Sequence, residues 1–227
     1  MRSTKQAEPD ERSSGSGGER TRPRAPYRRW LQDAERVDVA LYAAIARTPT
    51  PALDRVMGRL SRAADYSRLS IASAALLALT GGRQGRRAAA SGLACVGVTA
   101  TVVNLAVKPL GRRRRPDRVA QSVPLTRHVR MPASTSFPSG HAAAAFAFAT
   151  GVGQVMPVVA VPLRGLATLV AYSRVHTGVH YPGDVVTGAL MGTVLAQITT
   201  QALERWREAA MTHTADRAVD PQPRNPT

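Results

Sequence analysis

Charged residues divide the chain into long uncharged windows. Ala88–Val107 lies between Arg87 and Lys108 without a charge, and Val185–Leu203 runs uncharged to Glu204. Each window approaches the ~20 residues that a helix needs to cross a bilayer. The stretch 142–163 is also uncharged, although its prolines suggest a shorter helix, and shorter uncharged windows lie at 69–82 and 165–173. No alternation of apolar and polar positions typical of half-buried strands stands out, so the predicted fold class is all-α.

These windows favour a polytopic membrane bundle of about six helices. They are rich in the small residues that let helices approach closely in lipid, and the longest exceed a typical buried core helix. A soluble helical bundle is the alternative. Helices are expected at Gln32–Ala46, Pro51–Ala64, Arg68–Leu79, Arg87–Val107, Ser139–Val155, Pro162–Val175 and Asp184–Arg207. Pro157 and Pro162 indicate that the helix beginning at Ser139 ends before them.

The two ends of the chain have a different composition from its centre. Residues 1–30 combine Ser, Gly, Pro and charges of both signs, and 208–227 have the same character, so both are predicted to be disordered. No apolar stretch follows the N-terminal charges, so a cleavable signal is not expected. A single domain is therefore predicted over 31–207.

The chain is strongly basic, with a net charge of +16. This charge predicts an anionic partner, which by charge alone is a nucleic acid, an acidic membrane face or a phosphorylated substrate. The single Cys95 sits in an uncharged stretch. It can form no intrachain disulfide, so we interpret it as a small buried apolar residue.

The first candidate motif is KPLGRRRRP, which follows the Ala88–Val107 window. Lys108 opens it, and Arg115 and Pro116 follow after six intervening residues. Arginine offers a planar fork that can grip two phosphate oxygens, and lysine supplies a compact charge. The arginine run by itself is equally compatible with a topology signal, a nucleic-acid patch or a solvated loop.

The second motif, FPSGHAAAAFAFAT, places a histidine at the mouth of an apolar helix. Pro138 and Gly140 bend the backbone, Ser139 is a good helix N-cap, and His141 falls in the first turn. Backbone N–H groups at a helix start carry partial positive charge and can bind an anion. A histidine there can donate a proton to that anion, although a lone PSGH is also compatible with simple capping.

The third motif is SRVHTGVHYPGD. It contains Ser173 and Arg174, then His180, and then Asp184 after an interruption by Pro and Gly. The interruption predicts that Asp184 caps the following helix, close enough along the chain to orient an imidazole. A histidine held at one nitrogen by a carboxylate presents the other nitrogen as a nucleophile or base. We interpret His176 in the same segment as structural or peripheral.

In this order, the three motifs resemble the three-part signature of the type 2 phosphatidic acid phosphatase (PAP2) superfamily. Every signature position is filled with the family's spacing, from the helix that ends at Lys108 to the helix after Asp184. The resemblance implies an all-α membrane bundle with a PAP2/haloperoxidase-like core, in which the three motifs gather at one end. The chain termini lie outside the resemblance.

The resemblance also implies a role for each signature residue. His180 would attack phosphorus to form a phosphohistidine, Asp184 would orient His180, and His141 would protonate the leaving oxygen. The phosphoryl oxygens would be held by Lys108, Arg115, Ser139, Gly140 and Arg174. No metal and no cofactor are expected, because cationic side chains and backbone donors would supply the charge stabilisation.

The expected partners are a membrane and a phosphorylated lipid, either phosphatidate or an isoprenyl diphosphate, and not a nucleic acid. Charges at the ends of apolar windows are costly and usually functional, and helices that reverse at each window bring those ends to one face.

A multi-pass protein of the plasma membrane is expected. The basic N-terminal segment and the GGRQGRR turn favour the cytoplasm, which places the catalytic face outside. RRRRPDR would then also lie outside, against the positive-inside rule, and phosphate binding would explain it.

Three other readings are open. A vanadate-dependent haloperoxidase has a related architecture and similar oxyanion-binding residues, but a short chain with spanning windows argues against it. A basic module for nucleic acid or anionic lipid would account for the charge and the arginine run, although not for the placement of His141, His180 and Asp184. A lipid-binding protein that has lost catalysis would keep the pocket but not need every signature residue.

Overall fold

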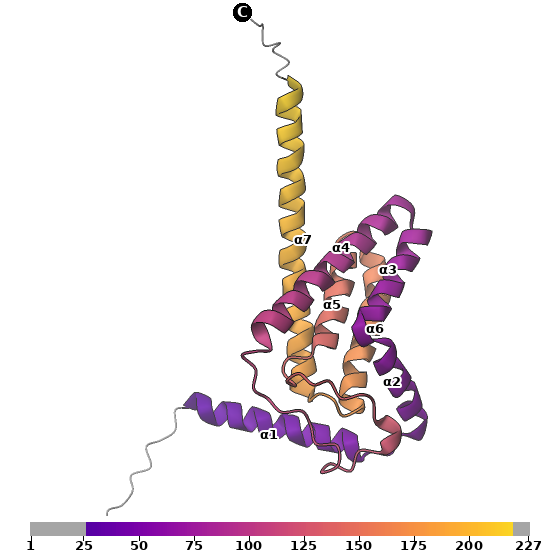
Figure 1. Ribbon diagram of the computed structural model, residues 1–227, viewed down its shortest axis with the longest axis vertical. Helices are drawn as coiled ribbons and strands as arrows, with labels where there is room; N and C mark the ends of the chain where they lie inside the picture. The colour runs from indigo at the N-terminus through magenta and orange to yellow at the C-terminus, as the bar shows by residue number, and fades with distance from the viewer. Residues whose placement is uncertain (1–25, 220–227) are drawn as a thin grey trace, which may run out of the picture. The chain divides into compact units, whose positions relative to one another are not determined.

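A computed structural model describes residues 26–219, and its described part contains seven α-helices and no strand (Figure 1). The helices are α1 (Pro26–Arg47), α2 (Pro51–Ala63), α3 (Arg68–Thr80), α4 (Gly82–Thr101), α5 (Gly140–Gly153), α6 (Pro157–His176) and α7 (Pro182–Val219). Three short helical turns accompany them: η1 (Asp65–Ser67), η2 (Val102–Val107), which is π-helical and continues α4, and η3 (Leu125–Arg127). The prediction of an all-α bundle is confirmed: the described helices correspond to the seven segments expected from the sequence, close to the bundle of about six.

The chain forms two units, one ending at Glu35 and the other beginning at Arg36. The described part of the first unit is the beginning of α1. All the contacts discussed below lie in the second unit.

Four helix boundaries differ from the sequence prediction by five residues or more. The first helix begins at Pro26 instead of Gln32, and the fourth begins at Gly82 instead of Arg87. The helix expected from Pro162 begins at Pro157, so Pro162 lies inside α6. Proline at the first position of a helix costs little because its missing N–H has no intrahelical partner there, and one more proline inside an apolar helix is tolerated when neighbouring helices pack around it. The last helix continues past Arg207 to Val219.

Of the tails predicted at 1–30 and 208–227, residues 1–25 and 220–227 lie outside the described residues. Where the structure describes them, at 26–30 and 208–219, the backbone is helical.

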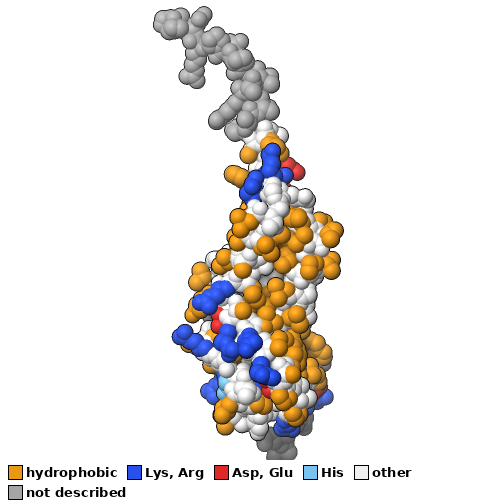
Figure 2. Space-filling view, turned by 90° about the vertical axis from the view of Figure 1, so that its right-hand side faces the viewer, with side chains coloured by type: hydrophobic (Ala, Val, Ile, Leu, Met, Phe, Trp, Pro, Cys, Tyr) orange, Lys and Arg blue, Asp and Glu red, His pale blue; other side chains and the backbone are white. Residues whose placement is uncertain are grey.

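Small side chains fill the interior of the bundle and large apolar side chains cover its outside. The buried alanines include Ala74, Ala88, Ala142, Ala147, Ala160 and Ala196, whereas Leu79, Leu105, Val158, Val161, Leu190 and Ile198 are exposed. Figure 2 shows this apolar surface along the bundle, with Lys and Arg side chains gathered toward the loop end and a smaller group near the end of α7. Such an inside-out distribution is expected where lipid, not water, surrounds the helices.

Within residues 26–219, two helices are long and apolar enough to span a bilayer, by length and composition. They are the continuous helix Gly82–Val107, with a mean hydropathy of 1.8, and α6, with a mean hydropathy of 1.3. The second long window predicted from the sequence, 185–203, lies within α7. The helices α3 and α5 have only 13 and 14 residues, short of the ~20 that a perpendicular span needs.

Helix α5 lies centrally among α4, α6 and α7 (Figure 1). It approaches α7 at backbone distance, because a Cβ added to Gly192 would come within 2.1 Å of the Ala143 carbonyl oxygen. At the start of both helices, the Ser139 N–H donates to the Asp184 carbonyl oxygen at 2.9 Å. This bond joins the first turns of α5 and α7, the two turns that carry the second motif and the end of the third.

Candidate active site

The three motifs meet at one end of the bundle. Lys108 follows η2, His141 lies in the first turn of α5, Arg174 lies in the last turn of α6, and Asp184 lies in the first turn of α7. The loop between Lys108 and α5 crosses the same end (Figure 1). The structure therefore brings together the residues that the sequence singled out, as expected for helices that reverse direction at each end.

His180 sits between a carboxylate and a guanidinium. Its Nδ1 lies 3.5 Å from Asp184 Oδ2, and its Nε2 lies 3.3 Å from Arg115 Nη1. Because a guanidinium can only donate, Nε2 must be the nitrogen with the free electron pair, and Nδ1 must carry the proton toward the carboxylate. In this tautomer the nitrogen with the free electron pair faces a guanidinium, a group suited to hold a phosphate.

Asp184 is completely buried and held from several directions. Its Oδ2 accepts hydrogen bonds from the Ser136 hydroxyl and the Tyr181 N–H, and its Oδ1 accepts one from Arg113 Nη1 at 2.9 Å. Buried carboxylates need such partners to remain charged. The predicted helix cap is only partly realised, because α7 begins at Pro182 and Asp184 lies inside its first turn.

Arg113 is a site residue that sequence reasoning missed. It forms a second ion pair with Asp38 of α1, with Nη2 2.7 Å from Oδ2, and its guanidinium lies 4.1 Å above the Tyr181 ring. The other oxygen of Asp38 accepts the Gly183 N–H. Arg113 and Asp38 thus clamp both the side chain and the backbone of the segment from His180 to Asp184.

Arg115 and Lys108 lie beside one another near the start of α5. Arg115 Nε donates to the Ser134 carbonyl oxygen at 2.8 Å, and Lys108 Nζ donates to the Ser134 hydroxyl at 3.2 Å. A Cβ added to Gly140 would lie 3.6 Å from Lys108 Nζ, so the ammonium group faces the start of the helix. Ser139 caps that helix by accepting the Ala142 N–H. Two cations and a helix N-terminus form a natural anion site.

His141 contacts a carboxylate that the sequence analysis did not identify. Its Nε2 lies 2.9 Å from Asp65 Oδ1, and the same oxygen lies 3.6 Å from Arg174 Nη1. Arg174 also donates to the Ser61 hydroxyl at 2.6 Å, and its Nε is buried without a partner among the described residues. Ser61 lies near the end of α2 and Asp65 lies in η1, between α2 and α3, so neither belongs to a signature motif.

The electrostatics favour an anion at this end of the bundle. Burial lowers the pKa of Lys108, and the positive charge of Arg115 lowers it further. Burial lowers the pKa of His180 to about 4, aided by the charges of Arg115 and Arg174 and opposed by Asp184. His180 is therefore neutral at pH 7, and a bound phosphate would relieve the crowding of positive charge.

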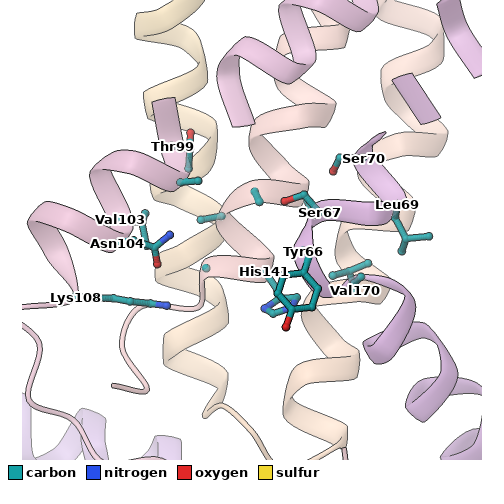
Figure 3. Close-up of a pocket in the computed structure, with 16 residues that line it drawn as sticks. Tyr66, Ser67, Leu69, Ser70, Thr99, Val103, Asn104, Lys108, His141 and Val170 are labelled. Atoms are coloured by element: carbon teal, nitrogen blue, oxygen red, sulfur yellow. The ribbon is translucent and has the colours of Figure 1, made fainter. Parts of the chain in front are cut away.

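A cleft of about 190 Å³ opens beside these residues. Figure 3 shows Lys108 and His141 at its lower edge, with Thr99, Val103 and Asn104 on one side and Leu69, Ser70 and Val170 on the other. The alanines of α5 form its floor. The cleft is thus apolar along the helices and cationic at its end, which suits a ligand with an apolar body and an anionic head.

His176 lies apart from this constellation. Its Nε2 is 2.9 Å from Asp54 Oδ1, which Arg127 Nε also contacts at 2.7 Å, and all three side chains are buried. This arrangement agrees with the structural interpretation of His176. No group of three or more His, Cys, Asp or Glu arranged to hold a metal ion occurs between residues 26 and 219.

Comparison with known proteins gives concordant matches. The profile of the PAP2 superfamily matches residues 88–208. Decaprenylphosphoryl-5-phosphoribose phosphatase of Mycobacterium tuberculosis (strain CDC 1551 / Oshkosh) is 39% identical over 103 residues, which is 44% of this chain and 52% of that protein. The match thus spans about half the length of this relative. The protein of the same name from Mycolicibacterium smegmatis is 33% identical over 162 residues, 70% of this chain and 84% of that one.

The fold also matches a solved structure. A transmembrane PAP2 type phosphatidylglycerolphosphate phosphatase from Bacillus subtilis superimposes with a TM-score of 0.57 at 24% identity, over 76% of this chain and 87% of that one. At this identity the match bears on the fold alone.

Proposed function

The chain belongs to the PAP2 superfamily, and from this premise we propose that it is an integral membrane phosphatase that hydrolyses a lipid phosphate through a phosphohistidine on His180. The observation that carries the proposal is the setting of His180, with Asp184 at Nδ1 and Arg115 at Nε2. A buried, neutral, oriented imidazole beside a guanidinium suits nucleophilic attack on a bound phosphate.

In the proposed reaction, His180 Nε2 attacks phosphorus while the bond from phosphorus to the leaving oxygen breaks. His141 donates a proton to that oxygen, and Asp184 stabilises the positive charge that develops on His180. His141, now neutral, takes a proton from a water molecule as the water attacks phosphorus. The bond between phosphorus and Nε2 then breaks, which releases phosphate and restores both histidines.

Phosphate binding is assigned to three cationic side chains and to the start of α5, of which Lys108 and Gly140 line the cleft. The assigned residues are Lys108, Arg115, Arg174, Ser139 and Gly140. Charge on the phosphoryl oxygens is then balanced by the protein's own side chains, so the proposed reaction requires no metal ion. Burial of these cations makes each interaction stronger than it would be in water.

We propose that the substrate is a phosphate ester on an isoprenyl-linked lipid. Two relatives carry the name decaprenylphosphoryl-5-phosphoribose phosphatase, and the cleft supplies an apolar wall of Leu69, Val103 and Val170 next to Lys108 and His141. A long apolar chain can lie along the helices in the bilayer while its phosphate reaches the cations.

Phosphate release tests the proposal. Detergent-solubilised protein is assayed with EDTA on phosphatidate, an isoprenyl diphosphate and decaprenylphosphoryl-5-phosphoribose, alongside His180→Ala. Release that survives EDTA and disappears in the variant is the expected result, and the fastest substrate identifies the lipid class. His128→Ala is the matched control, since the His128 ring contacts the Val123 carbonyl oxygen and no motif residue among those the structure describes. Equal activity of His180→Ala and wild type would exclude the phosphohistidine.

We further propose a multi-pass location in the plasma membrane with the catalytic end on the extracytoplasmic face. The arginine run 112–115 belongs to the catalytic end, where Arg113 and Arg115 have partners inside the site. Its charge therefore has a function other than setting topology. Reporter fusions inserted between Arg118 and Pro132 are expected to lie outside the cell. A reporter found in the cytoplasm would show that the protein has the opposite orientation.

A further inference from the structure

Asp65 lies in none of the three motifs, yet it contacts two of them. Its Oδ1 is 2.9 Å from His141 Nε2 and 3.6 Å from Arg174 Nη1. A carboxylate only accepts hydrogen bonds, so His141 Nε2 must carry a proton and Nδ1 is the nitrogen that can exchange a proton with a substrate. The contact therefore fixes the roles of the two ring nitrogens, as Asp184 does for His180.

The backbone around Asp65 adopts an unusual conformation. The next two residues, Tyr66 and Ser67, both have a φ of +56°, in the left-handed region that side chains with a Cβ rarely adopt. Two such residues in a row are maintained only where the surrounding structure determines them. They form η1, which joins α2 to α3 and points Asp65 at the first turn of α5. Tyr66 and Ser67 also line the cleft next to His141.

The contacts and the exposure of Asp65 do not fit a residue that serves only to stabilise the fold. Arg174 already donates to the Ser61 hydroxyl and carbonyl oxygen, at 2.6 and 3.2 Å, so its nearer partner is not Asp65. The Asp65 side chain is 33% exposed, unlike Asp54, which is buried in an ion pair with Arg127. A partly exposed carboxylate that contacts an imidazole, on a turn whose Tyr66 and Ser67 line the cleft, fits a site better than a core.

We propose that Asp65 is a positioning residue that acts through His141. It fixes the imidazole by accepting from Nε2–H and favours the protonated ring, which passes the Nδ1 proton to the leaving oxygen as the phosphorus–oxygen bond breaks. In the second half of the reaction, Nδ1 takes a proton back from the attacking water. This inference rests on the proposed function and adds the η1 turn to the active site.

Leaving groups of different basicity distinguish this role from a structural one. An alkyl alkoxide needs a proton to depart, whereas nitrophenolate departs without one, so a defect in the acid affects only the first. The measured step is the first turnover, as decanol release from decyl phosphate and nitrophenolate release from nitrophenyl phosphate. Asp65→Asn is expected to slow decanol release at least about tenfold and to change nitrophenolate release less than about twofold.

A double-variant cycle tests whether Asp65 acts through His141. Adding Asp65→Asn to His141→Ala should slow decanol release no further, because the group that Asp65 positions is already gone. Asp65→Glu, which keeps the carboxylate, should recover part of the rate lost in Asp65→Asn. The matched control is Glu204→Gln on α7, at an exposed position remote from all motif residues, which should behave as wild type on both esters.

Several results would overturn the inference. One is an equal loss of decanol and nitrophenolate release in both Asp65→Asn and Asp65→Glu. Another is decanol release at the wild-type rate in Asp65→Asn. A third is a further loss of decanol release when Asp65→Asn is added to His141→Ala. Failure of the proposed function looks different: wild type would release neither product, or His180→Ala would release both at the wild-type rate. Elution of each variant as a single folded species in detergent separates loss of the fold from loss of the reaction.

Discussion

The two histidines of the site are each paired with a carboxylate, but the two pairs are built differently. Asp184 is 0% exposed and receives hydrogen bonds from Arg113, Ser136 and the Tyr181 backbone, in addition to its contact with His180. Asp65 is 33% exposed, sits on a short turn at the cleft, and contacts His141 and Arg174. One carboxylate is enclosed by the protein, and the other borders the space that a ligand would enter.

This difference follows from what each histidine is proposed to do. A nucleophile must keep its lone pair aligned with the phosphorus atom, so rigid support of the imidazole is an advantage. The carboxylate that gives this support does not need to face the ligand. A proton donor must reach a leaving group that differs between substrates and departs afterward. The enclosed pair is therefore expected to tolerate substitution worse than the open pair, and four predictions test this difference.

The largest effect is expected at Asp184. Asp184→Asn removes the charge that balances the developing imidazolium and releases the control over the His180 tautomer, and comparable substitutions in catalytic triads lower kcat by roughly 10⁴-fold. Phosphate release per folded molecule should fall at least about 10³-fold here, well beyond the loss in Asp65→Asn. A smaller loss of phosphate release in Asp184→Asn than in Asp65→Asn would contradict the expectation that the enclosed pair tolerates substitution worse.

Arg113 comes next, because it supports Asp184 without facing the ligand. Arg113→Gln should lower kcat by roughly ten- to a hundredfold with little change in KM, since geometry and not substrate binding is impaired. Arg113→Lys should recover little, because lysine cannot bridge Asp38 and Asp184 with a planar fork. The matched control is Arg114→Gln, an exposed neighbour in the same run. Equal effects of the two Gln variants on kcat would show that Arg113 contributes no more to the reaction than its exposed neighbour.

Sequence reasoning identified the enclosed pair and missed the open one for a physical reason. His180 and Asp184 are four residues apart and flank a Pro-Gly turn, so their proximity follows from local geometry. Asp65 and His141 are separated by 76 positions, and only the packing of η1 against α5 brings them together. A single Asp in the charged stretch between α2 and α3 carries no signal of its own.

Arg113 was missed because it is one of four consecutive arginines. Composition gives no means to distinguish Arg113, which is paired with Asp38 and Asp184, from its exposed neighbours Arg112 and Arg114. The predicted helices, by contrast, match the observed ones closely, because long uncharged windows are a property of the local sequence. The exceptions are the end of α7, which comes later than predicted, and the starts of α1, α4 and α6, which all come earlier, and in α6 packing overrides the local preference of Pro162.

The third prediction concerns the packing of α5 against α7, the helix whose first turn carries Asp184. A Cβ at Gly192 would meet the Ala143 carbonyl oxygen at 2.1 Å, so Gly192→Ala should separate α5 from α7 and lower the free energy of unfolding by roughly 1–3 kcal/mol. Gly165→Ala in α6, where nothing lies within 4 Å, should instead stabilise by roughly 0.5–1 kcal/mol through helix propensity. Thermal unfolding in detergent measures both changes, and shifts of the same sign would contradict close packing at Gly192.

The smallest effect is expected from the enclosure of His180 itself. Burial lowers its pKa from 6.5 to about 4 in the folded protein. Between these values the unfolded chain binds a proton that the folded chain does not, so stability is fully present above pH 6.5 and is lost as the pH falls toward 4. The loss is about 1.4 kcal/mol at most for each pH unit in that window. His180→Gln has no such proton, so its unfolding midpoint in detergent should fall less than that of wild type between pH 7 and pH 5. Parallel curves for the two proteins would mean that His180 is accessible to protons in the folded state, and the contrast between an enclosed and an open pair would then disappear.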